Sequence, residues 1–326
     1  MRKLGIAIAI VIVLLVVGAL VVPRVVDINS YHDQIQSQLG KKLGRQVSLG
    51  QMRLSLFPPA FQVQNATVGE DSSFPAGQPF ARVEKLSISV KLLPLLRKQV
   101  DIHSLELDRP HIELVRNAQG EWNFATLGTA STSTEPSKKP AGQLELAKLQ
   151  ISDGQLAITD YQKHQSRAVY DYIDLTVTDF APNREFTIEA AAHLQGQGKQ
   201  TVSVKGKGGP IQQANLLNTN FDGGLHLEQV SVSAAEKFLN SQALRGIEAL
   251  VSGDAKLKNS NGKMASDGII KFENPQVHQL NVGYPITMEY EVADDLTADV
   301  IEVRRGNIKL GTTPITIAGK IGRAHV

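Results

Sequence analysis

The pattern of apolar and polar positions changes twice along this chain of 326 residues. Residues 4–22 contain only Leu, Ile, Val, Ala and Gly. A helix of that length spans about 28 Å, close to the thickness of the hydrocarbon layer of a bilayer. We therefore expect one membrane-spanning helix, with apolar positions that include Leu4, Ile8, Ile12, Leu15, Leu20 and Val22. A cleaved signal peptide is the alternative, although the apolar run continues past the small residues Gly18 and Ala19.

A second pattern, with apolar residues three or four positions apart, follows this run and predicts a short amphipathic helix. The apolar positions are Ile28, Tyr31, Ile35, Leu39 and Leu43. Asp27 or Asn29 is the expected N-cap, and Gly44 is the expected end. We expect this helix to pack on the domain that follows, and a position on the membrane surface is the alternative.

From Val47 onward the period of the pattern is 2, which predicts strands. Residues 52–56 and 61–63 alternate around the pair Pro58 and Pro59, which predicts a hairpin, and residues 86–92 predict another strand that ends before Pro94. Alternation dominates again after residue 142. Residues 234–250 are the exception, because Phe238, Leu239 and Leu244 have helical spacing.

An internal repeat supports an extended β structure. Residues 100–114 align without a gap on residues 144–158, with Gly154 at the position of Pro110, and residues 301–310 form a third copy with Gly306 there. Each copy predicts a strand, a tight turn or bulge, and a second strand. Such strand pairs cannot bury their apolar sides alone, so we expect them to join edge to edge into one antiparallel sheet with one apolar and one polar face.

The composition of the chain suggests five segments. Residues 1–26 form the membrane anchor, residues 27–128 a β domain with its leading helix, and residues 143–320 a continuing region of β repeats. Residues 129–142 consist largely of Ser, Thr, Pro, Lys and Gly, which predicts a flexible linker. Residues 321–326 read Ile-Gly-Arg-Ala-His-Val, which a widely used sequencing adapter encodes in frame. We therefore expect a truncated gene product with a non-native tail.

The composition argues against several kinds of chemistry. The net charge is +2 with 20% charged residues, which gives no strong field for nucleic acid. The chain has no Cys, and its eight His residues show no metal-ligand spacing. Residues 196–200 and 206–209 are rich in Gly but do not match a phosphate-binding loop, so we interpret them as hairpin turns. Trp122 and Phe124 are interpreted as core anchors of a sheet end. We predict no catalytic residue, no cofactor and no metal site.

Several segments together resemble the AsmA family of envelope proteins in their order and spacing. They are the anchor, residues 44–47 (Gly-Arg-Gln-Val) with Pro58, residues 92–96, residues 105–112 and residues 120–124 (Gly-Glu-Trp-Asn-Phe). The resemblance is specific over residues 1–128 and looser over residues 142–320. It implies a protein anchored by one helix in the bacterial inner membrane, with most of the chain in the periplasm and a part in outer-membrane biogenesis. Family members usually extend much further than this chain.

The resemblance also implies a fold and a function. The family is similar to chorein-type bridge-like lipid transfer proteins, so we expect a mostly β fold: a transmembrane helix, then an extended, curled antiparallel sheet, groove-like or taco-like, with a few short helices. On alternation alone, the apolar positions of the first β domain would be ordinary sandwich core. The resemblance instead implies that they line a groove for phospholipid acyl chains: Leu54, Leu56, Ile88, Val90, Leu105, Leu107, Ile112 and Leu114.

Two hypotheses of function remain open from the sequence. The first is a non-enzymatic envelope protein that binds or conducts phospholipid between the inner and outer membranes. The alternative is an assembly factor that targets or inserts outer-membrane proteins, by pairing its sheet edges with strands of these or other envelope partners.

Overall fold

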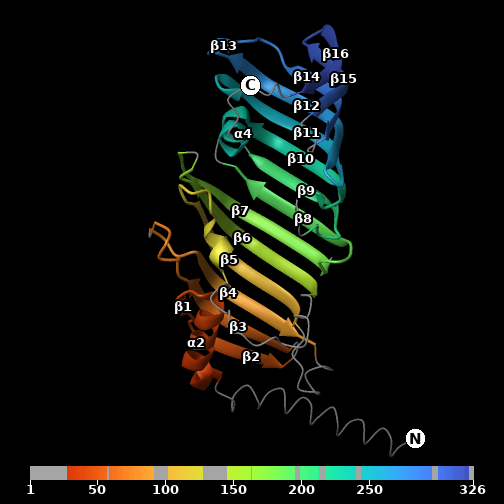
Figure 1. The fold of residues 1–326 in the computed structure, drawn as a ribbon. Coiled ribbons are helices and arrows are strands. Elements are labelled where there is room, and N and C mark those ends of the chain that lie inside the picture. The colour runs from red at the N-terminus through yellow and green to blue at the C-terminus, as the bar shows by residue number, and fades with distance from the viewer. Residues whose placement is uncertain are drawn as a thin grey trace, which may run out of the picture. The chain divides into compact units, whose positions relative to one another are not determined.

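The computed structural model describes most of the chain beyond the predicted anchor (Figure 1). The described residues are 28–56, 59–75, 77–91, 102–127, 145–162, 164–194, 199–212, 218–239, 244–295 and 300–322. The predicted membrane helix, residues 92–101, the predicted linker and most of the predicted tail lie outside them. Two units can be distinguished, Met1–Lys138 with Ala157–Arg167, and Lys139–Leu156 with Ala168–Val326. Each unit is described by itself.

The first unit contains short helices and the first strands of the sheet. The helices are η1 (Ile28–Tyr31), α2 (His32–Leu43) and η2 (Asn123–Thr126). The strands are β1 (Val47–Ser48), β2 (Met52–Leu56), β3 (Pro59–Val68), β4 (Ala81–Val90) and β5 (Ile102–Arg116). β6 (Leu146–Asp160) and β7 (Gln165–Phe180) contribute residues to both units.

The second unit is built from long strands and one described α-helix, α4 (Val232–Leu239). Its strands are β8 (Phe186–His193), β9 (Thr201–Gly208), β10 (Phe221–Ser231), β11 (Ile247–Ser260), β12 (Lys263–Val277), β13 (Leu280–Asn281), β14 (Ile286–Asp295), β15 (Val300–Leu310) and β16 (Thr313–Gly322).

The sixteen described strands pair in nearly the order of the chain, from β1 and β3 to β16, with β2 on β3 and β13 on β12. The strand pairs within each unit are antiparallel. The prediction of a mostly β fold with an open antiparallel sheet and a few short helices is thus confirmed. The predicted hairpin is also present, as β2 and β3.

Helix α2 packs on the start of the sheet, as the amphipathic pattern predicts. Ile35 and Leu43 contact a core that includes Met52 and Val63. The helix ends at Gly44, whose φ of 67° is left-handed, as expected for a glycine C-cap. The N-cap prediction is wrong for Asn29, because η1 precedes α2 and Tyr31 occupies the cap position without a side-chain hydrogen bond. Asp27 lies outside the described residues.

The polar side of this helical segment satisfies backbone groups beside β1 and β2. The Asn29 amide accepts a hydrogen bond from the Met52 N–H at 2.9 Å and donates one to the Met52 carbonyl at 3.2 Å. Gln36 accepts from the Leu49 N–H at 3.0 Å, and His32 Nε2 lies 2.6 Å from the Leu49 carbonyl oxygen. Asn29 is therefore engaged with the sheet, and this explains why it does not cap the helix.

The three sequence repeats correspond to single long strands with an internal irregularity, not to hairpins. They lie in β5, β6 and β15. Arg109 in β5 and Asp153 in β6 have positive φ angles of 48° and 53°, next to the aligned Pro110 and Gly154. In β15 the pairing shifts between Val303 and Gly306. The predicted turn is wrong for all three copies, whereas a bulge is present in β15. In β5 the pairing with β4 continues in register past Arg109.

This irregularity keeps the apolar residues of the first unit on one side of the sheet. Ala66 belongs to the same buried core as Val63, although Asn65 between them has a φ of 51°. Ala66 pairs with Val83, which pairs with Pro110, and residues directly opposite one another share a face. The apolar positions on both sides of the irregularity therefore face the same way.

A buried polar network joins two segments that are far apart in the sequence. Arg45, with 1% of its side chain exposed, pairs with Glu70 at 2.6 Å and donates to the Asn123 carbonyl at 2.6 Å. The fully buried Asn123 amide donates to Glu70 at 2.6 Å and accepts from the Val115 N–H. Beside them, hydrogen bonds from Ser73 lower the pKa of Asp71 to about 2. Two of the segments that carry the family resemblance, residues 44–47 and 120–124, therefore meet here.

The interpretation of Trp122 and Phe124 as core anchors is wrong for Phe124, whose side chain is 45% exposed. The two rings stack at 5.9 Å, and the Arg116 guanidinium lies over Trp122. Asn123 is the buried residue of the three. Because its amide must face the polar network, its two neighbours point away.

Two further predictions are wrong in the second unit. The helical pattern of residues 234–250 gives only α4, because β11 begins at Ile247 and its alternating positions Ala249 and Val251 are buried in the sheet. Gly206 and Gly208 lie within β9 and not in a hairpin turn. Residues 195–198, which include Gly196 and Gly198, lie outside the described residues.

We predict that Arg45→Met lowers the free energy of unfolding by about 3 to 5 kcal/mol, because it leaves the buried Glu70 carboxylate without its cation. Chemical denaturation of the full chain measures this loss. The control is Lys207→Met, which removes an ion pair to Glu185 with both side chains 63% exposed. This substitution is expected to cost less than about 1 kcal/mol. An equal loss in the two variants would contradict the stabilising role of the network.

We also predict that docking of α2 depends on pH through His32. The hydrogen bond to Asp33, with a smaller contribution from the Leu49 carbonyl, raises the pKa of His32 above its ordinary value. The folded state then holds the proton more tightly than the unfolded chain does. The resulting stability is complete below about pH 6.5 and is lost as the pH rises through the raised pKa. The stability difference between the wild type and His32→Gln should shrink with rising pH, and a constant difference would exclude this effect.

Candidate functional site

Cross-strand pairing divides the second unit into two chemically different faces. Residues directly opposite one another lie on the same side of a sheet, so the pairing register defines rows that run across the strands. One row contains Val202, Leu227, Gly253, Ile270, Met288, Ile308 and Ile315. The next contains Val204, Leu225, Ala255, Gly268, Tyr290, Gly306 and Ile317. We call the side that carries these rows the apolar face.

The opposite side carries charged residues and is called the polar face. Its ion pairs join neighbouring strands: Lys205 with Glu189, Lys258 with Asp222, His226 with Asp254, and Arg305 with Glu289. These side chains are at least 46% exposed. Exposed pairs of this kind contribute little stability, but they keep this face in water. The prediction of one apolar and one polar face is therefore confirmed for this unit.

Glycines show that the apolar face is concave where they occur. A Cβ atom added to Gly206 or Gly223, which oppose each other, would lie 2.7 Å from the Cα atom of the partner. Real Cβ atoms essentially never come within 3.0 Å of another heavy atom, so the two strands are closer here than a pair of residues with side chains would allow. On the polar face, a Cβ added to the adjacent Gly224 would meet nothing closer than 3.7 Å. The backbones of β9 and β10 thus approach each other on the apolar side and diverge on the polar side.

Similar close approaches occur further along the strand order. A Cβ added to Gly268 would lie 2.7 Å from the Cα atom of its partner Ala255. The Phe221 ring lies over Gly206 and Gly223, since its Cζ would be 2.7 Å from either added Cβ. An aromatic ring that covers paired glycines is a known means of stabilising a curved sheet. The predicted curl is thus seen locally in this unit.

Helix α4 covers only one end of the apolar face. Val232 of α4 forms a buried cluster with Ala249 and Val251, against which Leu227 and Phe272 pack. Within the described part of this unit, no other buried hydrophobic cluster of this kind lies on the face. Leu225 and Ile308 are only partly buried, and Ile317 is 45% exposed. The face therefore offers a broad apolar surface that the described residues do not cover.

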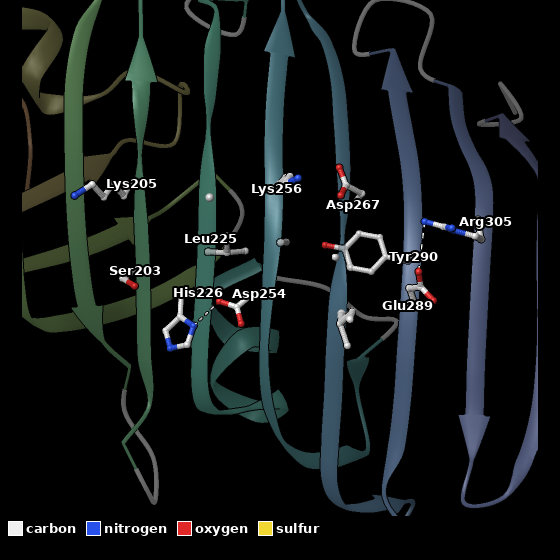
Figure 2. A pocket seen from close by; sticks show the side chains of 14 residues that line it. Ser203, Lys205, Leu225, His226, Asp254, Lys256, Asp267, Glu289, Tyr290 and Arg305 are labelled. Atoms are coloured by element: carbon white, nitrogen blue, oxygen red, sulfur yellow. Dashed lines mark hydrogen bonds and ion pairs between the residues drawn. The ribbon is translucent and has the colours of Figure 1, made fainter.

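A shallow hollow of about 600 Å³ is lined mostly by residues of the polar face, and Leu225 and Tyr290 of the apolar face also contribute to it (Figure 2). Its lining includes Ser203, His226 and Asp254, which oppose one another on β9, β10 and β11. This order resembles a Ser-His-Asp triad, and His226 Nδ1 lies 2.8 Å from Asp254 Oδ1. In the described part of the chain, however, no hydrogen bond joins Ser203 to His226. His226 and Asp254 are 52% and 83% exposed, so water competes for both.

The hollow also lacks an excess of either charge. Arg305 is paired with Glu289, Lys205 with Glu189, and Lys256 opposes Asp267. Among the described residues, no group of three or more His, Cys, Asp or Glu side chains could hold a metal ion. The arrangement therefore gives the polar face no evident affinity for an anion or a metal. The apolar face is the stronger candidate for a functional site.

The predicted lining residues of the first unit lie on the side of the sheet that α2 partly covers. Leu54, Ile88 and Leu105 share one cross-strand row through Phe61. Leu107 opposes Leu86, in the row of the buried Met52 and Val63. These leucines and Ile88 are partly buried. The row of Leu54 therefore lies immediately beside the core under α2.

The other predicted lining residues continue the same side. Val90 opposes Ile102, Ile112 opposes Ala81, and Leu114 follows two residues later in β5. Leu56 opposes Pro59, and its side chain lies outside the described residues. The structure brings these residues onto one face, and their role in binding stays a prediction.

The membrane anchor also stays a prediction. Leu4, Ile8, Ile12, Leu15, Leu20 and Val22 lie outside the described residues. Within the part that the structure describes, no helix is both long and apolar enough to cross a bilayer.

The lining residues predicted from the sequence all lie in the first unit, and none was predicted in the second. The signal was present, because Val202 and Val204 alternate with Ser203 and Lys205. What the sequence could not show was the register that places Val204, Leu225 and Tyr290 in one row. The sequence also does not reveal the curvature at Gly206 and Gly223, because a glycine within a strand cannot be distinguished from a glycine in a turn by its local pattern.

Comparison with known proteins gives one match. The sequence model of the AsmA family matches residues 1–274. No curated protein and no solved structure matches the chain significantly.

We predict that Gly223→Ala destabilises the second unit by about 1 to 3 kcal/mol, because the new methyl group would overlap the backbone of β9. The matched control is Gly224→Ala, which adds the same methyl group on the open polar face and is expected to change stability by less than about 1 kcal/mol. Thermal unfolding of the two full-length variants measures the difference. Equal destabilisation would show that the sheet is not curved toward the apolar face.

Proposed function

Because this chain belongs to the AsmA family, we propose that it is a non-enzymatic protein of the cell envelope that binds or conducts phospholipid acyl chains on the apolar face of its sheet. The observation that carries this proposal is the concave apolar face of the second unit, which the described residues leave largely uncovered.

The physical basis of binding is the removal of acyl chains and side chains from water. Burial of one methylene group contributes about 0.8 kcal/mol, so a long acyl chain can be held without charge or covalent chemistry. Val204, Leu225 and Ile308 provide branched aliphatic contacts. The concavity lets contacts form from several strands at once.

The predicted anchor indicates where in the cell this binding would occur. A helix at residues 4–22 would hold the chain in the bacterial inner membrane, and the bulk of the chain would then lie in the periplasm, as the family resemblance implies. Lipid leaving the bilayer would then exchange one apolar environment for another. We propose that the first unit, whose candidate lining includes Ile88 and Leu105, contributes to the same activity.

The second candidate function is assembly of outer-membrane proteins by strand addition. It is favoured by β16, whose residues 313–320 are all exposed. An extended client segment could pair with such a strand through main-chain hydrogen bonds. This mechanism uses the edge of the sheet and does not require an uncovered apolar face.

The proposal is tested by site-specific crosslinking in the intact bacterial envelope. A photoreactive phenylalanine analogue placed at Leu225, on the apolar face, is expected to capture phospholipid. The same analogue at the adjacent His226, on the polar face, is the control and is expected to capture none. Mass spectrometry of the crosslinked full chain identifies the adducts. Lipid at both positions or at neither would contradict the proposal, and protein adducts at β16 without lipid at 225 would favour assembly.

A further inference from the structure

The apolar face of the second unit carries a pair of hydroxyl groups near its middle. Tyr290 of β14 opposes Gly268 of β12, and its hydroxyl oxygen lies 3.0 Å from Ser266 Oγ. Because Gly268 has no side chain, the tyrosine ring can extend diagonally from β14 across β12, as Figure 2 shows for the ring. Ser266 is itself flanked by Leu257 and Val292 in its own row. The two hydroxyls are therefore set among apolar side chains.

This pair has a hydrogen-bond donor to spare. Two hydroxyl groups carry two hydrogens, and a hydrogen bond between them uses only one. Either oxygen can be the donor in that bond, so the hydrogen of the other hydroxyl points elsewhere. Within the described residues, neither the Ser266 nor the Tyr290 hydroxyl forms another hydrogen bond. Both residues are partly exposed, which leaves this donor accessible from the apolar face.

The polarity of the face changes along the strands on either side of the pair. Toward one strand end, the row beyond Ser266 contains the polar residues Asn259 and Asp294, with Met264 between them. Toward the other end, the face continues through Ile270 to Phe272, at the cluster under α4. Phe272 lies six positions after Ser266 along β12, a distance of about 20 Å at the rise of a strand. One leaflet of a bilayer has about 15 Å of hydrocarbon. An acyl chain therefore fits between the hydroxyl pair and α4.

We propose that Ser266 and Tyr290 form the site that recognises the ester carbonyl of a glycerolipid, with its acyl chains directed toward α4 and its headgroup toward Asn259 and Asp294. This inference rests on the proposed function and specifies its ligand. An ester carbonyl accepts a hydrogen bond and adjoins an alkyl chain, which matches a donor on an apolar surface. An ether-linked lipid has the same chains but no carbonyl, so it cannot accept this bond.

The test compares dioleoyl phosphatidylethanolamine with its dioleyl ether analogue. Each lipid is added to the purified full chain in detergent, and native mass spectrometry measures how much is bound. One neutral hydrogen bond predicts a preference for the diester of about two- to tenfold. The double variant Ser266→Ala with Tyr290→Phe is expected to lose this preference and to keep its affinity for the diether lipid. Both hydroxyls must be removed because either can donate alone.

Tyr284→Phe is the matched control, since Tyr284 lies between β13 and β14 and its ring packs against Gly311. This variant is expected to keep the preference of the wild type. Equal binding of diester and diether by the wild type, or a preference that survives in the double variant, would overturn the ester site and leave the proposed function standing. A charge at position 225 should weaken binding of both lipids if they occupy the apolar face. If Leu225→Glu leaves the binding of both lipids unchanged, they do not occupy this face, and the proposed function itself fails.

Discussion

The structure depends on one constraint, that side chains of a strand alternate between the two faces of a sheet. A strand as long as β5 or β6 must keep its apolar residues on one face over 15 residues. The repeat does not alternate strictly, because an odd number of steps, five, separates Leu107 from Ile112 at the facing ends of its two apolar pairs. The positive-φ residues Arg109 and Asp153 absorb this mismatch. Without them, Leu105 and Ile112 would face opposite sides, and neither face would be apolar throughout.

The buried network around Arg45 imposes a second constraint, on the start of the sheet. Arg45 and Glu70 lie in two separate loops and Asn123 begins η2, and each supplies a group that the others need. An incomplete network of this kind destabilises the fold, because a buried charge or polar group is left without a partner. A complete network favours a single arrangement of its side chains. It explains why residues 44–47 and 120–124 occur together in the pattern that resembles the AsmA family. Their shared role is to hold the first unit together.

The sequence predicted the chemistry of the faces better than their geometry. Alternation was enough to predict β2, β3 and β4, and the repeat predicted β5, β6 and β15 as related elements. It could not distinguish a turn from a bulge, because both tolerate Gly or Pro next to a polar residue. Local helical spacing in residues 234–250 was overridden by pairing of Ala249 and Val251 within the sheet. The hydroxyl pair of Ser266 and Tyr290 depends on register between β12 and β14, which local patterns do not contain.

The glycines of the apolar face have a consequence for how such a protein can change over time. The curvature at Gly206, Gly223 and Gly268 is set by the main chain, whereas the apolar character of the face comes from side chains such as Leu225 and Ile308. Shape and surface chemistry are thus encoded at different positions. Substitution of an aliphatic residue can change the chemistry of the face without straightening the sheet, while substitution of a glycine alters the form of the surface and leaves its chemistry intact. A lineage can therefore vary the surface of this face by exchanging aliphatic residues on an inherited scaffold.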